Sequence, residues 1–383
     1  MKVMLVGNLP EDCQESMLRF LSMMRRGLEA RGHSVIETSP RLRLARAIGN
    51  YSYAGWRKYL GYWDKFVLFP RHLAHRIHQE APDVIHVVDH ANAVYAKQSP
   101  ERSVVTCHDL QQIRAARGEI PQQRVGRMGR QYQKWIMRQI RESRNLVAVS
   151  NKTAADLARV GHLSPEKISV IPNALNDPFA PVVREEALGR IIPFLRCKGI
   201  ALSAGLPPFV LNVGGGQWYK NRPGLLRIFA QLHAKLPERP WLLMVGKPLA
   251  TSDQQIAKDL GVSERLIQVQ DVPNPELNAL YSLAEGLLFP SLEEGFGWPL
   301  AEAQACGCPV FTSNRSPMCE VAGPSAVLFD PEKPEIAAQA ILQAWPRRFA
   351  LADAARPSAE RWSPETMLRA YEKIYQRITA QRS

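Results

Sequence analysis

The residues best suited to chemistry are two glutamates, Glu294 and Glu302, which lie eight positions apart in the segment 291–314. Gly-Phe-Gly follows the first glutamate, and Pro299 is suited to the first turn of a helix. A carboxylate accepts hydrogen bonds and donates none, so Glu302 suits the adjacent hydroxyls of a ribose and Glu294 suits the hydroxyls of a sugar. The pair therefore predicts a pocket that binds a nucleotide sugar.

The loop between the glutamates, Gly295, Phe296 and Gly297, is suited to an anion. Glycines let the main chain approach a ligand closely, and the positive end of the following helix attracts a diphosphate without a metal ion. An apolar run at 284–290 precedes the loop, and residues 307–310 end the helix and open another strand. The loop is therefore expected at the carboxyl end of a strand in a β/α array, where such sheets bind ligands. Taken alone, the motif also fits an ordinary turn with two solvated glutamates.

The rest of the chain contains two series of alternating strands and helices. Strands are expected at 2–6, 83–88, 103–107, 145–149 and 167–171, and then at 209–213, 241–245, 265–269, 285–289, 309–312 and 326–329. Helices are expected at 14–31, 126–143 and 151–160, and then at 221–235, 252–260, 275–283, 299–306 and 333–344. This alternation predicts an α/β chain with two doubly wound, Rossmann-like domains.

A proline-rich stretch without clean periodicity separates the two series. We therefore expect an N-terminal domain at 1–180, a linker region at 181–207 and a C-terminal domain at 208–362. The last segment, 363–383, begins with Ser-Pro and continues as a strongly amphipathic helix. Its apolar side predicts that this terminal helix packs on another part of the chain.

The sequence from Glu294 to Val310, Glu-Gly-Phe-Gly-x-Pro-x-x-Glu-Ala-x-Ala-x-Gly-x-Pro-Val, resembles the signature of family 4 retaining glycosyltransferases (glycosyl transferases group 1). Further similar segments lie at Gly32–Val35, Cys107–Leu110, Val149–Ser150, Ile171–Asn173, Lys220–Asn221 and Glu320–Gly323. The resemblance implies the GT-B fold, with the acceptor on the first domain and a nucleotide-diphosphate sugar on the second. It also implies that the terminal helix crosses back to the first domain.

The resemblance adds residues of the second domain to the candidate donor site. It gives Lys220 and Asn221, at a helix start after Gly215 and Gly216, the role of holding the diphosphate. A tight turn is the alternative for the glycine run alone. Many members of the family carry an arginine a few residues before this lysine, where the present chain has Gly and Gln. Arg222 or the amides of the glycines are the candidates to replace it.

In the first domain the resemblance points to His108, because the matching histidine of the family binds the donor sugar near its reactive carbon. Catalysis is accordingly assigned to His108 and Glu294. His90 also ends a strand and is expected to bind the acceptor, together with Gly7 and Asn8, which resemble the family's glycine-rich loop without its second glycine. A structural role is the usual alternative for one isolated histidine.

The net charge of +13 is concentrated in two segments of the first domain. Residues 41–78 carry eight basic residues against one acidic residue, and residues 113–144 carry nine against two. Tyrosine, tryptophan and phenylalanine side chains interleave with these charges. Such a surface suits an anionic membrane or an anionic acceptor, and nucleic acid only third, because no nucleic-acid motif accompanies the charge. The alternative is a solvated helix face over an ordinary core.

Metals, cofactors and membrane spans are not expected. The six cysteines fit no zinc spacing and are interpreted as reduced thiols. No apolar run approaches the eighteen or so residues of a membrane span, and the amino terminus resembles a buried strand rather than a signal peptide. The expected location is the cytoplasm, with peripheral attachment to the inner face of the membrane if the basic segments bind lipid.

The sequence therefore predicts a metal-independent retaining glycosyltransferase that moves a sugar from a nucleotide-diphosphate donor to a hydroxyl of a glycan or lipid-linked acceptor. Cell-surface polysaccharide or lipopolysaccharide synthesis is the expected setting. Two alternatives stay open: a nucleotide-sugar epimerase or phosphorylase of the same fold, and a non-catalytic protein that binds nucleotide sugar or nucleic acid. The first is distinguished by whether the donor is consumed only when an acceptor is present.

Overall fold

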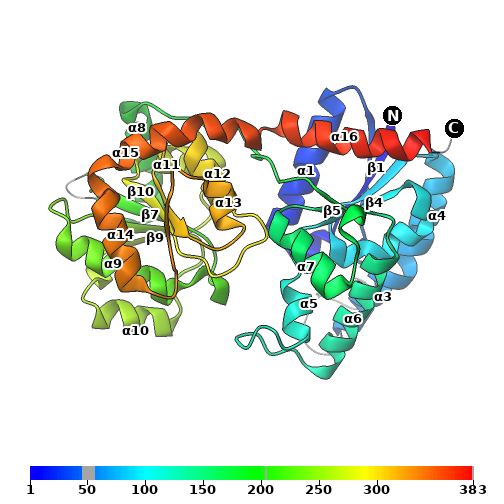
Figure 1. Cartoon of the computed structure of the whole chain (residues 1–383), viewed down its shortest axis with the longest axis horizontal. Coiled ribbons are helices and arrows are strands. Elements are labelled where there is room, and N and C mark those ends of the chain that lie inside the picture. Colours follow the sequence, from blue (N-terminus) through cyan, green and yellow to red (C-terminus); the bar gives the residue numbers. More distant parts are fainter. Residues whose placement is uncertain (45–56, 203–204, 382–383) are drawn as a thin grey trace. The chain divides into compact units, whose positions relative to one another are not determined.

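The computed structural model describes residues 1–44, 57–202 and 205–381, which form two compact units (Figure 1). Unit 1 consists of Met1–Asn176 and Pro364–Ser383, and unit 2 consists of Asp177–Ser363. Each unit has its own sheet of six parallel strands with helices packed on it. The predicted two-domain α/β fold is therefore confirmed, including a terminal helix that belongs to the first unit. Residues 45–56, part of the first basic segment, lie outside the described residues.

The sheet of unit 1 has the order β2-β1-β3-β4-β5-β6. Its strands are β1 (Lys2–Val6), β2 (Ser34–Thr38), β3 (Val84–Val87), β4 (Ser103–Cys107), β5 (Asn145–Ala148) and β6 (Ile168–Val170). All neighbouring pairs are parallel, so the carboxyl ends of the strands meet at one edge of the sheet. Only β2 was not predicted among these. It lies at the sheet's edge and is only partly buried, so it lacks the continuous apolar run of the central strands.

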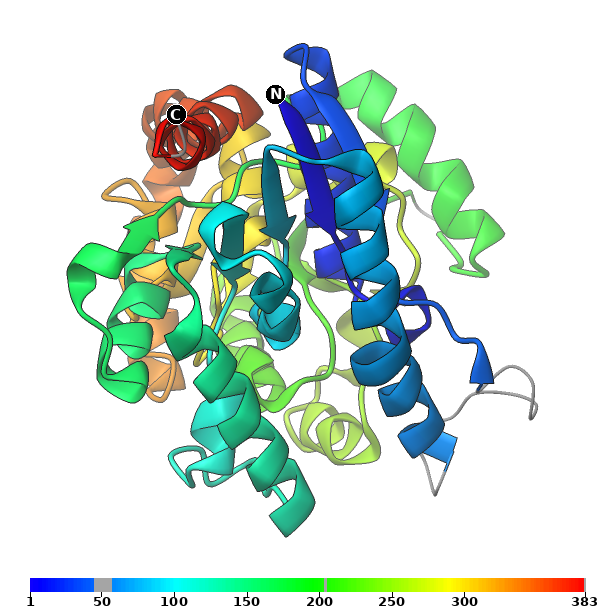
Figure 2. The same cartoon turned by 90° about the vertical axis from the view of Figure 1, so that its right-hand side faces the viewer.

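The helices of unit 1 cover its sheet. They are α1 (Glu15–Ala30), α3 (Arg57–Trp63), α4 (Phe69–Glu80), α5 (Gln111–Ala116), α6 (Arg127–Glu142), α7 (Asn151–Gly161) and α16 (Pro364–Ala380). A π-helical turn, Asp64–Leu68, joins α3 to α4, and the three pieces form one long helical run, drawn in blue in Figure 2. Helix α4 packs on the core of unit 1 through its buried residues Phe69 and Leu73.

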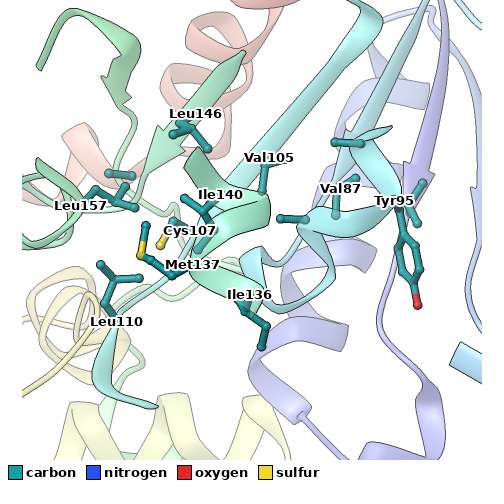
Figure 3. Packing of buried hydrophobic residues seen from close by; sticks show 14 of the residues in the cluster. Val87, Tyr95, Val105, Cys107, Leu110, Ile136, Met137, Ile140, Leu146 and Leu157 are labelled. Carbon is teal, nitrogen blue, oxygen red and sulfur yellow. The ribbon is translucent and has the colours of Figure 1, made fainter. Parts of the chain in front are cut away.

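The core of unit 1 forms where helical and strand periodicities meet. Ile136, Met137 and Ile140 of α6 recur at the spacing of one helix face and lie with Val105 and Cys107 of β4 (Figure 3). The opposite face of α6 carries the basic residues. Helix α6 thus has one apolar face and one basic face.

Unit 2 repeats the design with the strand order β12-β11-β10-β7-β8-β9. Its strands are β7 (Phe209–Val213), β8 (Trp241–Val245), β9 (Leu266–Val269), β10 (Gly286–Phe289), β11 (Val310–Ser313) and β12 (Val327–Phe329). Its helices are α8 (Arg184–Cys197), α9 (Arg222–Lys235), α10 (Thr251–Asp259), α11 (Asn274–Leu283), α12 (Trp298–Ala305), α13 (Met318–Ala322), α14 (Pro334–Ala344) and α15 (Arg348–Ala355). Every strand expected in this half is present within two residues at its ends.

The stretch 181–207, expected as a linker region, contains helix α8, which packs against α11 of unit 2. Ala187, Ile191 and Leu195 form its buried stripe at a spacing of four residues. Pro193 lies inside the helix and obscured this periodicity in the sequence. The described chain passes from unit 1 to unit 2 at residues 176 and 177, before α8 begins.

None of the helices in the described part of the chain has the length and apolarity needed to span a bilayer.

Candidate functional site

At the carboxyl edge of the unit 2 sheet, an ion pair joins two of the predicted donor-site residues. Lys220 precedes α9, and Glu294 lies in the loop after β10. The Nζ atom of Lys220 donates to Oε1 of Glu294 at 2.7 Å, and both side chains are largely buried. Residues 74 positions apart in the sequence thus meet at the edge where parallel sheets bind ligands.

Asn221 holds the two loops of this ion pair together. It adopts a left-handed backbone conformation, with φ of +52°, and caps α9 by accepting a hydrogen bond from the Gly224 amide. Its Nδ2 group donates to the carbonyl oxygens of Pro290, at 3.1 Å, and Pro331, at 2.9 Å. A side chain that satisfies a helix start and two carbonyl groups fixes the geometry around the neighbouring Lys220. Asn221 therefore has a structural role that its predicted donor-binding role did not require.

Two glycines at this edge have a positive φ, and one of them lies against the main chain of another loop. Gly297 has φ of +99° and begins α12, and a Cβ atom there would lie 3.2 Å from Leu300. Gly246, after β8, has φ of +137°, and a Cβ atom there would lie 2.1 Å from the carbonyl oxygen of Gly214. The loops after β7 and β8 therefore meet main chain to main chain. Beside Gly215 and Gly216, an added Cβ would meet the side chains of Gln217 and Arg222.

Glu302 lies deeper than Glu294. It is the fifth residue of α12. Only 2% of Glu302 is exposed, and its Oε2 atom accepts a hydrogen bond of 2.9 Å from the hydroxyl of Tyr281 on α11. Burial and the nearby carboxylate raise the pKa of Tyr281 well above its ordinary value, so this phenol stays a donor. Tyr281 was missed in the sequence because it lies within an ordinary apolar helix pattern.

Phe296, the residue between the two motif glycines, is a buried packing residue. Its ring meets Trp362 edge to face, with centroids 5.3 Å apart, and Trp298 at 6.4 Å. Its side chain therefore holds the loop in place by packing against these two rings. Any donor contact at this position is left to the main chain.

Arg222, a candidate to replace the arginine found in many members of the family, binds main-chain carbonyl groups. Its guanidinium donates from Nη1 to the carbonyl oxygen of Pro248, at 2.7 Å, and from Nη2 to that of Lys247. Burial lowers its pKa from the ordinary value. Arg222 thus fastens the loop after β8 to the start of α9, and both of its terminal nitrogens are engaged by the main chain.

In unit 1, His108 follows β4 at the carboxyl edge of the sheet and is buried. Its Nε2 atom donates to the carbonyl oxygen of Val88 at 2.9 Å, and its ring meets Phe20 of α1 edge to face at 4.9 Å. Burial lowers its pKa from the ordinary value, so the ring is neutral near pH 7. Among the described residues nothing else hydrogen-bonds this ring, which leaves the lone pair of Nδ1 as an acceptor for a hydroxyl.

The residues predicted to bind the acceptor gather around Asp89, which was not among the predicted site residues. Asn8 donates from Nδ2 to Oδ2 of Asp89 at 2.6 Å and accepts from Asn92 at 2.9 Å. His90 Nδ1 lies 3.2 Å from Oδ1 of Asp89, which also accepts from the Ala91 amide at 3.0 Å. Burial alone would raise the pKa of Asp89, but the hydrogen bond and charge of His90 outweigh burial and keep this pKa below its ordinary value.

Asp89 could have been found from its place, since it directly follows the apolar run of β3 and precedes His90. Asn92 carries no comparable signal. Gly7 has a packing reason for lacking a side chain, because a Cβ atom there would lie 2.6 Å from both Leu21 and Ser39. The structure thus brings Asn8 and His90 into one network.

The two basic segments adjoin through their aromatic side chains. Tyr62, beside α3's end, stacks on Tyr132 of α6 with ring centroids 5.7 Å apart, and Phe66 meets Trp135 edge to face at 5.0 Å. Most of these rings are therefore part of the packing between helices. Tyr59, Trp63 and Met128 are the large side chains of the adjoining helices that stay exposed, at 47%, 53% and 70%. Tyr59 and Trp63 are thus the exposed aromatic residues among those that the structure describes in the two segments, and Tyr51, Tyr53 and Trp56 lie outside the described residues.

All six cysteines are free thiols. Within the described ranges, no group of three or more His, Cys, Asp or Glu side chains is arranged to hold a metal ion. Metal independence stays a prediction.

Two family models match neighbouring parts of the chain. The model described as Glycosyltransferase Family 4 matches residues 18–177, and the model described as Glycosyl transferases group 1 matches residues 200–362. O-antigen chain mannosyltransferase B of Escherichia coli is 27% identical over 258 residues, which is 66% of this chain and 64% of the relative. The chain thus spans less than two thirds of that curated relative's length.

Solved structures match over nearly the whole chain. A glycosyltransferase from Rickettsia africae superposes with a TM-score of 0.73 at 18% identity, over 98% of both chains. HepE of Anabaena, solved in complex with UDP and glucose, superposes with a TM-score of 0.69 at 14% identity, over 98% of this chain and 99% of the other. At such identities these likenesses establish the fold. Together with the two matched models and the intact glutamate motif, they show that the chain belongs to the family 4, group 1 glycosyltransferases, which have the GT-B fold.

Proposed function

We propose that this protein is a retaining, metal-independent glycosyltransferase that moves a hexose from a nucleotide-diphosphate donor to a hydroxyl of a glycan or lipid-linked acceptor. Unit 2 binds the donor and unit 1 binds the acceptor. The observation that carries this proposal is the buried ion pair between Lys220 and Glu294 at the carboxyl edge of the unit 2 sheet. Its setting between glycine-bearing loops is suited to a diphosphate and a sugar side by side.

Each donor-site residue has a chemical task in this proposal. Lys220 leaves its pairing with Glu294 in part and turns its charge to the diphosphate, which stabilises the leaving group as the glycosidic bond breaks. Glu294 accepts hydrogen bonds from the sugar hydroxyls, and Glu302, oriented by Tyr281, accepts from the ribose. The amides of Gly215, Gly216 and the start of α12 complete the anion site without a metal ion.

The transfer step needs no separate base from the protein. The bond from the anomeric carbon to the phosphate oxygen breaks, and a bond to the acceptor oxygen forms on the same face of the sugar. The acceptor's proton passes to the departing phosphate, which becomes the protonated product. Neutral His108 accepts a hydrogen bond from a sugar hydroxyl through Nδ1. This contact keeps the sugar ring in place while positive charge develops at its anomeric carbon.

The relatives support surface polysaccharide as the setting, because the first curated relative is named for an O-antigen mannosyltransferase activity. Mannose is accordingly the first sugar to test. A nucleotide-sugar epimerase or phosphorylase of the same fold has no observation of its own in its favour.

Calorimetry against UDP, GDP, ADP and TDP sugars, beginning with the mannose donors, tests the donor site. We expect one base to bind at least tenfold more tightly than the others, and Glu294→Gln to weaken turnover of that donor. Consumption of the donor only with a glycan acceptor identifies a transferase. Conversion of the donor without acceptor identifies an epimerase, and RNA binding that survives moderate salt without sugar-nucleotide binding overturns the proposal. Unchanged turnover in EDTA tests metal independence.

We also propose that the basic and aromatic surface of unit 1 contacts an anionic membrane carrying the acceptor. The surface consists of Tyr59, Trp63 and Met128 with the exposed cations Arg127 and Arg130 of α6. Trp63→Ala should reduce sedimentation with vesicles that contain anionic lipid, and salt should weaken binding of the parent protein. Phe349→Ala, an equally exposed aromatic of unit 2, is the matched control. Equal binding to neutral vesicles would contradict a charge-driven contact.

A further inference from the structure

A buried chain of polar side chains joins helix α16 to the sheet of unit 1. The hydroxyl of Tyr375 lies 2.7 Å from Nδ1 of His86, and Nε2 of His86 lies 2.7 Å from the hydroxyl of Thr106. The same Thr106 hydroxyl lies 3.0 Å from the hydroxyl of Tyr371. All four side chains have no exposed surface. The helix is therefore attached to β3 and β4 by hydrogen bonds that water does not reach.

Both ring nitrogens of His86 are paired while the ring is neutral. In either neutral tautomer one ring nitrogen donates and the other accepts, so both nitrogens are paired with hydroxyl groups. A protonated ring would donate to both hydroxyls, so the Thr106 hydroxyl would have to donate to Tyr371 and the Tyr375 hydroxyl could no longer donate to the ring. Burial, together with the charge of His108, lowers the pKa of His86 to about 3, so the ring is neutral at physiological pH.

A second contact joins the two strands nearer their carboxyl ends. β3 and β4 are parallel neighbours, and residues two apart in a strand share one face of the sheet. His86 and Thr106 make the first link between the strands. Val88 and His108, each two residues further on, make the second through the carbonyl oxygen of Val88 and Nε2 of His108. The buried link therefore lies two residues before the contact made by His108, the histidine assigned to catalysis, on each strand.

Phe20 of α1 connects the two levels. Its ring meets His108 edge to face at 4.9 Å and also lies 6.2 Å from His86 and 6.3 Å from Tyr371. A shift of the link between His86 and Thr106 therefore displaces the ring of Phe20, which packs on His108, because a close-packed interior transmits small movements.

We infer that α16 positions His108 through this chain, so that Tyr375, His86, Thr106 and Tyr371 are positioning residues for the transfer reaction. The inference rests on the proposed role of His108. It assigns the terminal helix a task in turnover in addition to its packing on unit 1.

A second attachment of the same helix provides the matched control. Arg31 donates from Nη2 to Glu372 of α16 at 2.7 Å, and His33 lies 2.8 Å from the same carboxylate. These groups fasten α16 to the end of α1 at the rim of the unit, and none of them touches β3 or β4 in a hydrogen bond given by the structure. Glu372→Gln thus loosens the helix without removing a member of the buried chain.

The experiment compares Thr106→Val and Tyr375→Phe with Glu372→Gln. Thr106→Val keeps the shape and removes the shared hydroxyl. We expect it to lower kcat about tenfold with the donor KM within twofold, and Tyr375→Phe to act in the same direction. Glu372→Gln should lower the melting temperature by a similar amount and leave kcat within twofold. Tyr371→Phe, which removes a terminal member only, is the variant to use where Thr106→Val does not fold.

A second readout does not depend on activity. The imidazole nitrogen resonances of His108 in the free protein report its tautomer and its hydrogen bond to Val88. They should shift in Thr106→Val and stay unchanged in Glu372→Gln. Unchanged His108 resonances, with kcat following only the melting temperature across all variants, would overturn the inference. A parent protein without transfer activity would refute the proposed function instead, while the resonances would still decide whether α16 positions His108.

Discussion

The carboxyl edges of the two sheets are built in different ways. In unit 2, the predicted residues meet through a charged contact between loops, Lys220 with Glu294, and the flanking glycines bring main chain against main chain. In unit 1, the predicted residues His108, His90 and Asn8 lie in hydrogen-bonded surroundings whose central members, Asp89 and Val88, were not predicted. One edge is organised by a sequence motif and the other by tertiary contacts.

This difference teaches where chemistry can be deduced from sequence. A motif of closely spaced residues on one loop and one helix start places its own members, because a few backbone positions fix them relative to each other. A set of residues from the ends of different strands is placed by the sheet, and its orienting partners can be any polar side chain nearby. Activity should therefore fall when a single motif residue at the unit 2 edge is replaced. At the unit 1 edge, activity should depend on the whole network of hydrogen bonds rather than on one residue.

The contrast between the two sheet edges fails if Glu294 can be replaced without loss of activity. Glu294→Gln keeps the shape, removes the charge that Lys220 contacts and weakens hydrogen bonds to sugar hydroxyls. A charged hydrogen bond contributes about 1.5 to 3 kcal/mol, so we expect kcat/KM to fall roughly 10- to 100-fold. Initial rates of donor consumption measure this effect. Glu332→Gln, which removes an exposed partner of Arg315, should leave the rate unchanged.

A double-mutant cycle sharpens the comparison further. Lys220→Met and Glu294→Gln remove the two ends of one ion pair, so their effects on donor affinity should not add. We expect a coupling of about 1 to 3 kcal/mol from the four dissociation constants. Additive effects would show that the two side chains act on the donor separately and that their contact in the structure has no energetic role.

Main-chain contact at the donor edge is tested at Gly246. A Cβ atom there would meet the Gly214 carbonyl at 2.1 Å, so Gly246→Ala should destabilise the protein by about 2 to 3 kcal/mol. Gly32 also has a positive φ, but an added Cβ meets nothing within 4 Å. Gly32→Ala should therefore cost only about 1 kcal/mol. Thermal or urea unfolding measures both, and equal losses would mean that the loops after β7 and β8 can separate freely.

Acid should destabilise unit 1 before unit 2, because the buried His86 has a pKa of about 3 in the folded state against 6.5 in the unfolded chain. A lowered histidine pKa gives full stability above pH 6.5, and this stability is lost as the pH falls, since the unfolded chain takes up the proton. His108 contributes with the same sign. We expect a loss of about 1 to 2 kcal/mol between pH 6.5 and 5.

Urea unfolding at several pH values measures this loss, and hydrogen exchange locates it. His86→Gln should flatten the dependence between pH 6.5 and 5. This window is chosen because Glu372, whose pKa is lowered to about 2 chiefly by its hydrogen bond to Arg31, loses its contribution only below about pH 4.5. Two outcomes together would contradict the assignment to His86. The two units of the parent protein would lose hydrogen-exchange protection at the same pH, and the stability of His86→Gln would fall with pH as steeply as that of the parent.

Much of the fold could be predicted from the sequence. The central strands are buried on both faces and therefore appear as short apolar runs, and helices such as α6 show their two faces clearly. The edge strand β2 and helix α8 were missed for physical reasons: partial burial shortened the apolar signal in one, and Pro193 interrupted it in the other. The terminal helix was expected because its amphipathic pattern is long and regular.

The candidate site shows the same division. Glu294 and Lys220 could be named from the sequence because the motif and the helix start mark them. Tyr281 could not, because the hydroxyl that orients Glu302 lies inside an apolar helix face and looks like a packing residue. His86 was counted only as part of a strand, since nothing in its neighbours shows that Tyr375 and Thr106 would meet its ring.

The discontinuity of unit 1 has a consequence for its synthesis. Unit 2 is one uninterrupted stretch of chain, whereas unit 1 needs α16, which follows unit 2 in the sequence. During translation, unit 2 can complete itself as it emerges from the ribosome. Unit 1 meanwhile keeps the apolar side of its sheet and the ring of His86 without their final cover until α16 has been made. Loss of α16, which follows unit 2 in the chain, should therefore damage the amino-terminal half first.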